Sequence, residues 1–188
     1  MSNIKIFLLV VGLLVLGTVT TVIVRSNGDN VLIEPGKYDN FATCLEDKGA
    51  VFYGAFWCPH CQAQKKLFGS SQKLLPYIEC STIDGQGQTQ TCIDKKVASY
   101  PTWEFTNSFT LESKDTPRKC IGGADDPALC SKIDKSIGTA WVINSIGISS
   151  PSDPVQNGTK WAFPALSRTS GEVSLENLAA LTSCVLPQ

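Results

Sequence analysis

Two cysteines separated by two residues are the part of this chain best suited to chemistry. They lie in the segment Cys58-Pro59-His60-Cys61, which directly follows the apolar run 51–57. A β-like run followed by a helix-forming stretch places both thiols at a helix N-terminus, with Cys58 near the N-cap and Pro59 at the first helical position, where its missing N–H costs nothing. Unpaired backbone N–H groups and the helix dipole stabilise a thiolate there. The pattern therefore predicts a dithiol that opens and closes a disulfide.

Two other interpretations of these cysteines stay open. Cys-x-x-Cys is also half of many zinc sites, and His60 between the thiols offers a third ligand. However, His60 is the only histidine of the chain, and no second Cys-x-x-Cys completes a tetrahedral site. A purely structural disulfide across two residues would close a small, strained ring. We therefore favour redox chemistry, and we expect no metal and no cofactor.

The composition favours an oxidising compartment. The chain has 188 residues, a formal net charge of -1 and Cys 8 in its composition. A charge so close to zero gives no electrostatic case for binding nucleic acid. A high and even number of cysteines is typical of proteins outside the cytosol.

The N-terminal segment predicts a membrane anchor. Residues 6–24 carry no charge and consist mainly of Leu, Val, Ile and Phe. As a helix this run would span about 28 Å, close to the thickness of a bilayer core. A cleaved signal peptide is the alternative, but the run exceeds the usual ~7–15 apolar residues and no Ala-x-Ala-like site follows. We expect an anchor over 1–25, with the following domain facing the periplasm, the extracellular space or an organelle lumen.

The rest of the chain predicts one α/β domain. A polar tether over 26–39 leads into a domain over 40–188. Strands and helices alternate at first, which implies a βαβ core with a right-handed crossover. The expected elements are helix 40–48, strand 51–57, helix 61–68, strand 77–80, helix 88–97, strand 102–105, strand pieces 161–163 and 167–169, and a helix capped by Ser174. The stretch 107–158 is too long for a connection and is interpreted as an insertion.

The motifs in their order resemble a known family. Trp57-Cys58-Pro59-His60-Cys61 at a strand–helix junction, and Tyr100-Pro101-Thr102 before a later strand, resemble the thioredoxin superfamily. More narrowly, the chain is similar to the thioredoxin-like domain attached to bacterial vitamin K epoxide reductase homologues. The similar motifs are residues 52–61, 64–69, 77–80, 90–92, 100–104, 171–172 and 175–179. The resemblance covers about residues 40–106 and 160–184.

This resemblance implies a fold and roles for the site residues. The fold would be a thioredoxin fold, a central mixed sheet flanked by helices, with the insertion before the last strand and one transmembrane helix in front. Cys58 would form mixed disulfides with partner proteins, and Cys61 would resolve them. Pro101 would be cis and lie beside the active-site disulfide, leaving backbone groups free to pair with an extended substrate. Trp57 would pack beside the site, and Tyr100 would line the groove or simply pack.

The resemblance also implies a function and partners. We expect a donor of disulfides to exported cysteine-containing proteins, in which His60 and the helix N-terminus stabilise the Cys58 thiolate. A separate, quinone-linked membrane oxidase resembling vitamin K epoxide reductase would recharge it, since that domain is absent from this sequence. The alternatives are a reductase or isomerase with the same residues, and a redox-inert binding module, which the intact dithiol disfavours.

The chain departs from the family at one chemically important position. Many thioredoxins carry a buried acid six residues before the first cysteine, where this chain has Phe52. The group that serves Cys61 in proton transfer therefore stays open. Glu104 is a weak candidate, and a solvated glutamate on a strand face is the simpler interpretation.

The remaining six cysteines are expected to form disulfides. Cys80 and Cys92 flank one strand–helix connection and match paired positions in the resembled domain. Cys120–Cys130 would then tie the insertion locally, and Cys44–Cys184 would join the first and last helices.

Overall fold

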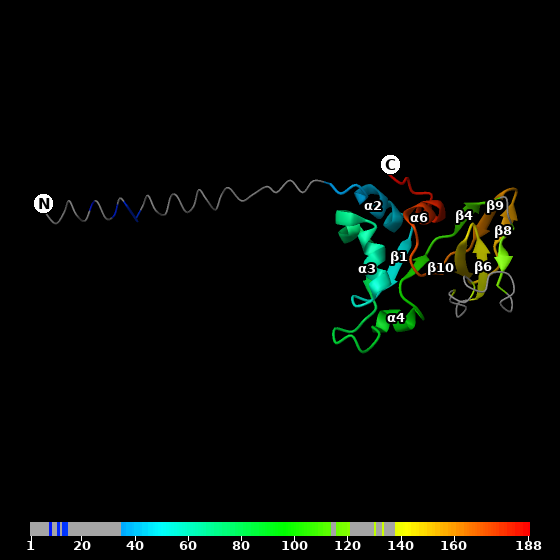
Figure 1. Cartoon of the computed structure of the whole chain (residues 1–188), viewed down its shortest axis with the longest axis horizontal. Helices are drawn as coiled ribbons and strands as arrows, with labels where there is room; N and C mark the ends of the chain where they lie inside the picture. Colours follow the sequence, from blue (N-terminus) through cyan, green and yellow to red (C-terminus); the bar gives the residue numbers. More distant parts are fainter. Residues whose placement is uncertain are drawn as a thin grey trace. The chain divides into compact units, whose positions relative to one another are not determined.

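The computed structural model describes residues 35–113, 116–120, 130, 133 and 138–188, together with residues 8, 11, 13 and 14. Residues 35–188 form one unit with two sheets, and the short helices gather around β1 and β10 (Figure 1). The larger sheet has seven strands in the order β2-β1-β3-β10-β7-β6-β5. The smaller sheet has the order β4-β9-β8.

The strands of the larger sheet are β1 (Ala50–Gly54), β2 (Tyr77–Glu79), β3 (Thr102–Phe105), β5 (Arg118–Lys119), β6 (Thr139–Ile143), β7 (Ile146–Ser150) and β10 (Ser167–Ser170). Those of the smaller sheet are β4 (Phe109–Glu112), β8 (Val155–Asn157) and β9 (Lys160–Phe163). β1 and β2 are parallel, whereas β1 with β3 and β3 with β10 are antiparallel. The strand expected over 102–105 is confirmed.

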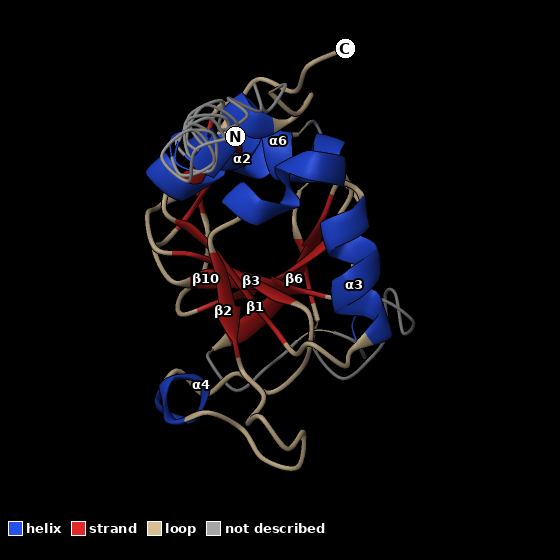
Figure 2. Ribbon diagram, turned by 90° about the vertical axis from the view of Figure 1, so that its left-hand side faces the viewer, coloured by secondary structure: helices blue, strands red, loops and turns tan. Residues whose placement is uncertain are grey.

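The helices are α2 (Asp39–Asp47), α3 (Pro59–Lys66), the 3-10 helix η1 (Gly69–Leu74), α4 (Gln90–Asp94) and α6 (Leu175–Thr182). α2 and α6 lie together at one end of the larger sheet, and α3 runs along its side (Figure 2). The predicted cap of α6 is confirmed, because the Ser174 hydroxyl accepts a hydrogen bond from the Asn177 N–H at 3.2 Å. Its Leu175, Leu178 and Leu181 are buried on one stripe.

The two faces of β1 contact different cores. Phe52 stacks on Trp103 with ring centroids 4.8 Å apart, in the main core that also contains Cys61. The next residue, Tyr53, points to the opposite face, as alternation along a strand requires. There it packs with Cys80, Cys92 and other residues of a smaller cluster. The dithiol and the neighbouring disulfide are thus on opposite faces of one strand.

The predicted fold class is wrong in two respects. The sheet has seven strands, because β5, β6 and β7 from the predicted insertion extend it beyond β10. This pairing satisfies backbone groups that would otherwise lie unpaired at the edge of β10. In addition, no helix among the described residues is long and apolar enough to cross a membrane. Most of the run 6–24, predicted as a transmembrane helix, lies outside the described residues. The observed class is mixed α/β.

A buried ion pair joins β3 to β10. Arg168 and Glu104 face each other in the strand register, and Arg168 Nε donates to Glu104 Oε2 at 2.7 Å. Arg168 Nη2 donates to the same Glu104 oxygen and to the Lys95 carbonyl, and Nη1 donates to the Lys96 carbonyl after α4. Glu104 is only 1% exposed, so its interpretation as a solvated glutamate is wrong. Its neighbour Trp103 belongs to the same core cluster as Cys61. Since successive side chains of a strand point to opposite faces, Glu104 lies on the face of the sheet away from Cys61. Glu104 is thus badly placed to serve that thiol.

Breaking this pair tests its role in stability. We expect Arg168→Met to lower the free energy of unfolding by about 3–5 kcal/mol, because it leaves the Glu104 carboxylate buried without its cation. Lys95→Met is the matched control: this exposed ammonium lies 3.3 Å from the same carboxylate, and its loss should cost about 1 kcal/mol or less. Urea unfolding measures both. A cost below about 1 kcal/mol for Arg168→Met would contradict this account.

Candidate active site

Cys58 occupies the N-cap of α3. β1 ends at Gly54, earlier than the predicted strand end at residue 57, and the chain turns before the helix begins at Pro59. The Cys58 sulfur accepts a hydrogen bond from the backbone N–H of Cys61 at 3.4 Å. Both cysteines are free thiols. The N-terminus of α3 therefore points directly at the sulfur of Cys58.

Cys61 lies deeper, between α3 and β1. It is 1% exposed, and the absence of a side chain at Gly54 makes room for it. A Cβ placed on Gly54 would lie 2.9 Å from the Cys61 sulfur and 3.0 Å from the Tyr77 ring. The pKa of the Cys61 thiol is raised to about 12. Burial is the largest cause, and the hydrogen bond with Cys58 is the second. At neutral pH Cys61 is therefore a protonated thiol.

The segment before β3 lies against Cys58. The Tyr100–Pro101 peptide bond is cis. The Cys58 thiol lies 3.8 Å from the Tyr100 carbonyl oxygen, and the Pro101 carbonyl accepts from the Gly171 N–H at 2.9 Å. Trp57 is 49% exposed and contacts Tyr100 edge-to-face, with ring centroids 6.2 Å apart. The structure thus brings these predicted site residues together around one sulfur.

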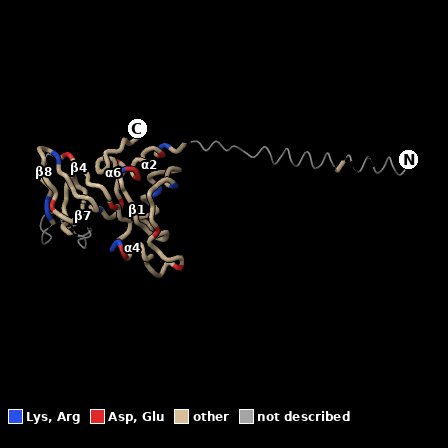
Figure 3. The backbone as a smooth tube through the Cα atoms, turned by 180° about the vertical axis from the view of Figure 1, so that it is seen from behind, with Lys and Arg blue, Asp and Glu red and all other residues tan. Residues whose placement is uncertain are grey.

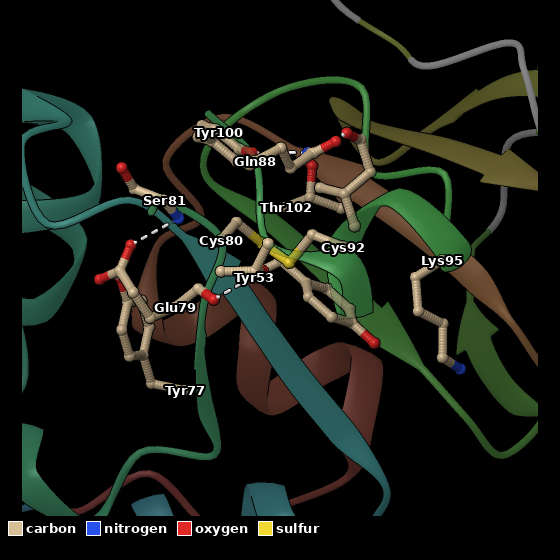
Figure 4. The surroundings of a disulfide bond; sticks show 12 residues. Tyr53, Tyr77, Glu79, Cys80, Ser81, Gln88, Cys92, Lys95, Tyr100 and Thr102 are labelled. Atoms are coloured by element: carbon tan, nitrogen blue, oxygen red, sulfur yellow. Dashed lines mark hydrogen bonds between the residues drawn. A yellow bond between two sulfur atoms is a disulfide. The ribbon is translucent and has the colours of Figure 1, made fainter. Parts of the chain in front are cut away.

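The disulfide Cys80–Cys92 belongs to the small core cluster against which Tyr100 packs (Figure 4). The loop between the two cysteines holds the rings of both Trp57 and Tyr100. Ser81 accepts from Trp57 Nε1 at 2.8 Å, and Gln88 Nε2 donates to the Tyr100 hydroxyl at 2.6 Å. Sequence reasoning missed these two polar contacts. The disulfide therefore constrains the loop that positions the exposed edge of the site.

His60 pairs with a residue that sequence reasoning also missed. Its Nδ1 lies 2.7 Å from Glu172 Oε1, 112 residues further along the chain. Gln64 of the same helix holds the neighbouring backbone: it donates to the Val173 carbonyl at 3.0 Å and accepts from the Val173 N–H at 2.7 Å. Residues 171–172 belong to the motifs that carry the resemblance, but no role for Glu172 at the site was predicted from the sequence, because the pairing of β10 with β3 is what brings it there. The carboxylate offsets part of the positive charge of a protonated His60.

The other six cysteines lie in pairs. Their Cα atoms are 5.9 Å apart in Cys44–Cys184, 5.5 Å in Cys80–Cys92 and 5.7 Å in Cys120–Cys130, all within the usual range for a disulfide. This arrangement leaves the Cys-x-x-Cys pair as the free thiols.

A groove of about 400 Å³ lies beside His60 and Tyr100. His60, Tyr100 and Glu172 line it from the site, and Ile133 and Gly147 line it from the predicted insertion. Acidic and basic residues are interspersed along the described chain (Figure 3), so no single charge dominates. Among the described residues, no group of three or more His, Cys, Asp or Glu is placed to hold a metal ion.

One comparison with known proteins bears on this site. A stretch of 63 residues, 31% of this chain, is 42% identical to "Thiol-disulfide oxidoreductase LTO1" of Arabidopsis thaliana. The similarity supports a redox enzyme. The matched stretch is 17% of that protein, so the chain spans a small part of its relative. No protein-family model matches the chain. The comparisons give no evidence of a fused vitamin K epoxide reductase domain.

Alkylation tests the protonation of Cys61. In Cys58→Ala, where Cys61 is the remaining free thiol, we expect slow reaction with iodoacetamide at neutral pH. Because only the thiolate reacts, the rate should rise about tenfold per pH unit well above the ordinary thiol pKa of ~8.5. Mass spectrometry after timed quenching measures the rate. The same variant unfolded in guanidinium is the control. Its alkylation rate should stop rising with pH near the ordinary thiol pKa. An alkylation rate that stops rising near pH 9 in the folded variant would contradict the assignment of Cys61 as a buried thiol.

Proposed function

We propose that this protein is a thiol–disulfide oxidoreductase that donates disulfides to exported, cysteine-containing proteins. The observation that carries the proposal is the unequal placement of the two thiols. Cys58, which is 5% exposed, caps the helix, whereas Cys61, which is 1% exposed, lies one turn further in. The resemblance to thioredoxin-like domains and the stretch shared with a thiol-disulfide oxidoreductase both support it.

The proposed cycle moves two electrons from substrate to protein. A substrate thiolate attacks the sulfur of Cys58 in the Cys58–Cys61 disulfide, and Cys61 leaves. A second substrate thiolate then attacks the substrate sulfur of this mixed disulfide, forms the substrate disulfide and releases Cys58. A quinone-linked membrane oxidase resembling vitamin K epoxide reductase would take up the two electrons and restore the protein disulfide.

The groove beside His60 and Tyr100 is the proposed site for the substrate chain. An extended segment there would lie against Tyr100 and the cis-Pro101 backbone, which favours recognition with little dependence on sequence. The predicted insertion contributes Ile133 and Gly147 to the opposite wall. An apolar side chain near the substrate cysteine would therefore be accommodated.

Trapping experiments test the roles of the two thiols. We expect Cys61→Ala to accumulate mixed disulfides with other proteins through Cys58, because the Cys61 thiol that attacks Cys58 and releases the partner is lost. Cys58→Ala is the matched control and should trap few partners, since its remaining thiol is buried and protonated. Non-reducing gels of cells blocked with acid and alkylating agent measure the adducts. Equal trapping by the two variants would contradict the assignment.

The reduction potential tests the direction of electron flow. The helix N-terminus and a protonated His60 stabilise the thiolate of Cys58, and hence the reduced pair, so we expect a potential well above the ~-270 mV of thioredoxin. His60→Ala should lower it, because a cation is lost and Glu172 is left as an unpaired anion near the site. Equilibration with glutathione buffers measures both values.

The double variant His60→Ala/Glu172→Gln is the control for this experiment. It removes the cation and the anion together, so its potential should lie between those of the wild type and His60→Ala. A wild-type potential at or below that of thioredoxin would indicate a reductase and would overturn the donor proposal.

A further inference from the structure

The proposed cycle requires a proton source for Cys61. When a substrate attacks Cys58, Cys61 must leave as a thiolate from a buried position. A thiol of high pKa is a poor leaving group unless it is protonated as it leaves. Neither of the acids considered from the sequence can supply this proton: residue 52 is a phenylalanine, and Glu104 lies on the other face of the sheet.

Lys65 is the cation that faces Cys61. Both residues belong to α3 and are four positions apart, so they share one face of the helix. Long helical side chains lean back toward the helix N-terminus, which directs Lys65 over the preceding turn and toward Cys61. The Lys65 ammonium lies 3.2 Å from the centroid of the Tyr77 ring. The same ring lies beside Gly54, next to the Cys61 sulfur, and Lys65 and Cys61 interact electrostatically.

Tyr77 and Glu79 hold this ammonium in place. The Tyr77 hydroxyl donates to Glu79 Oε2 at 2.8 Å, and the two side chains lie next to each other (Figure 4). Glu79 Oε1 accepts from the backbone N–H groups of Phe56 and Ser81 at 3.1 and 2.9 Å. The ring is therefore fixed by a carboxylate that the turn before α3 and the end of β2 hold rigidly. Lys65, Tyr77 and Glu79 are half-buried, so each of these side chains is partly exposed to water.

We propose that Lys65 donates the proton to Cys61 as this thiol leaves, and that Tyr77 and Glu79 are positioning residues for Lys65. This inference rests on the proposed function. The substrate–Cys58 S–S bond forms as the Cys58–Cys61 bond breaks, and the electron pair goes to the Cys61 sulfur. The sulfur takes a proton from the Lys65 ammonium, and the neutral amine then recovers a proton from water.

The protonation equilibria favour this transfer. Burial lowers the pKa of Lys65 and raises that of Cys61, which reduces the cost of moving a proton between them. The titratable groups facing Cys61 are Cys58 and Lys65 of α3, Tyr77 and Glu79 of β2, and Tyr100 before β3. Glu79 partly opposes the effect of burial on Lys65 and helps to keep it protonated.

Stopped-flow reduction of the oxidised full-length protein by excess 2-mercaptoethanol tests the proposal, with tryptophan fluorescence as the signal. We expect Lys65→Met to lower the rate constant about tenfold or more, a modest effect for general acid catalysis. Lys65→Arg should be slowed similarly, because a guanidinium keeps the charge but does not release its proton. Lys66→Met is the matched control on the exposed face of α3 and should stay within about twofold of the wild type.

The pH profile provides the second readout. After correction for the thiolate fraction of 2-mercaptoethanol, the wild-type rate should fall as the pH rises through the titration of Lys65. The Lys65→Met profile should be flat. Should Lys65→Met fail to fold, Tyr77→Phe keeps the ring but loses the bond to Glu79, and it should give a smaller loss of rate.

Two results would overturn the proposal. The first is a wild-type rate constant in Lys65→Met. The second is a wild-type rate constant in Lys65→Arg, which would mean that only the charge of Lys65 matters. If Lys65→Met does not fold, an unchanged rate in Tyr77→Phe would overturn it as well. In all these cases the wild-type reaction itself stays intact. Failure of the proposed function would look different, because the wild-type reduction potential would then lie at or below that of thioredoxin while the dependence of the rate on Lys65 stayed as expected.

Discussion

The pairing of β10 with β3 is the constraint on which the rest of the structure depends. The chain leaves β3, forms the extra strands and returns at β10, where Arg168 meets Glu104 in the buried ion pair. A shift of this register would separate the two charges and leave one of them buried alone, at a cost of several kcal/mol. The residues that follow β10 reach the site only in this register. They place Glu172 beside His60 and hold α3 through Gln64.

This arrangement gives the two thiols of the Cys-x-x-Cys pair different surroundings. Two sulfurs three positions apart meet opposite environments, because one lies at the end of a helix and the other under its first turn. Cys58 depends on the backbone dipoles of α3, whereas Cys61 depends on burial against Gly54. The neighbouring pair of Lys65 and Tyr77 compensates for that burial with a cation and an aromatic ring. A single strand–helix junction therefore places one sulfur at the helix N-cap and the other deeper, beneath the first turn.

The elements closest to the dithiol were predictable, because their signals are local. An apolar run before Cys-x-x-Cys predicts a strand and a helix start, and Ser174 before a leucine stripe predicts α6. The seven-stranded sheet was not predictable, since the order of β7, β6 and β5 depends on pairing between distant segments. The burial of Glu104 was not predictable for the same reason. In Thr-Trp-Glu-Phe it alternates like a solvent-facing residue, and its buried partner Arg168 lies 64 residues away. Glu172 joins the site across a still longer separation.

The disulfide between Cys44 and Cys184 has a mechanical consequence. It links α2 to α6 across a sequence separation of 140 residues, so almost the whole described unit lies inside one covalent loop. A pulling force applied at the two ends of that unit would pass through the short outer segments and the S–S bond. The strands and helices between them would carry none of that load, and the chain could not be drawn out to its contour length. Reduction of this one bond would expose the full loop to tension.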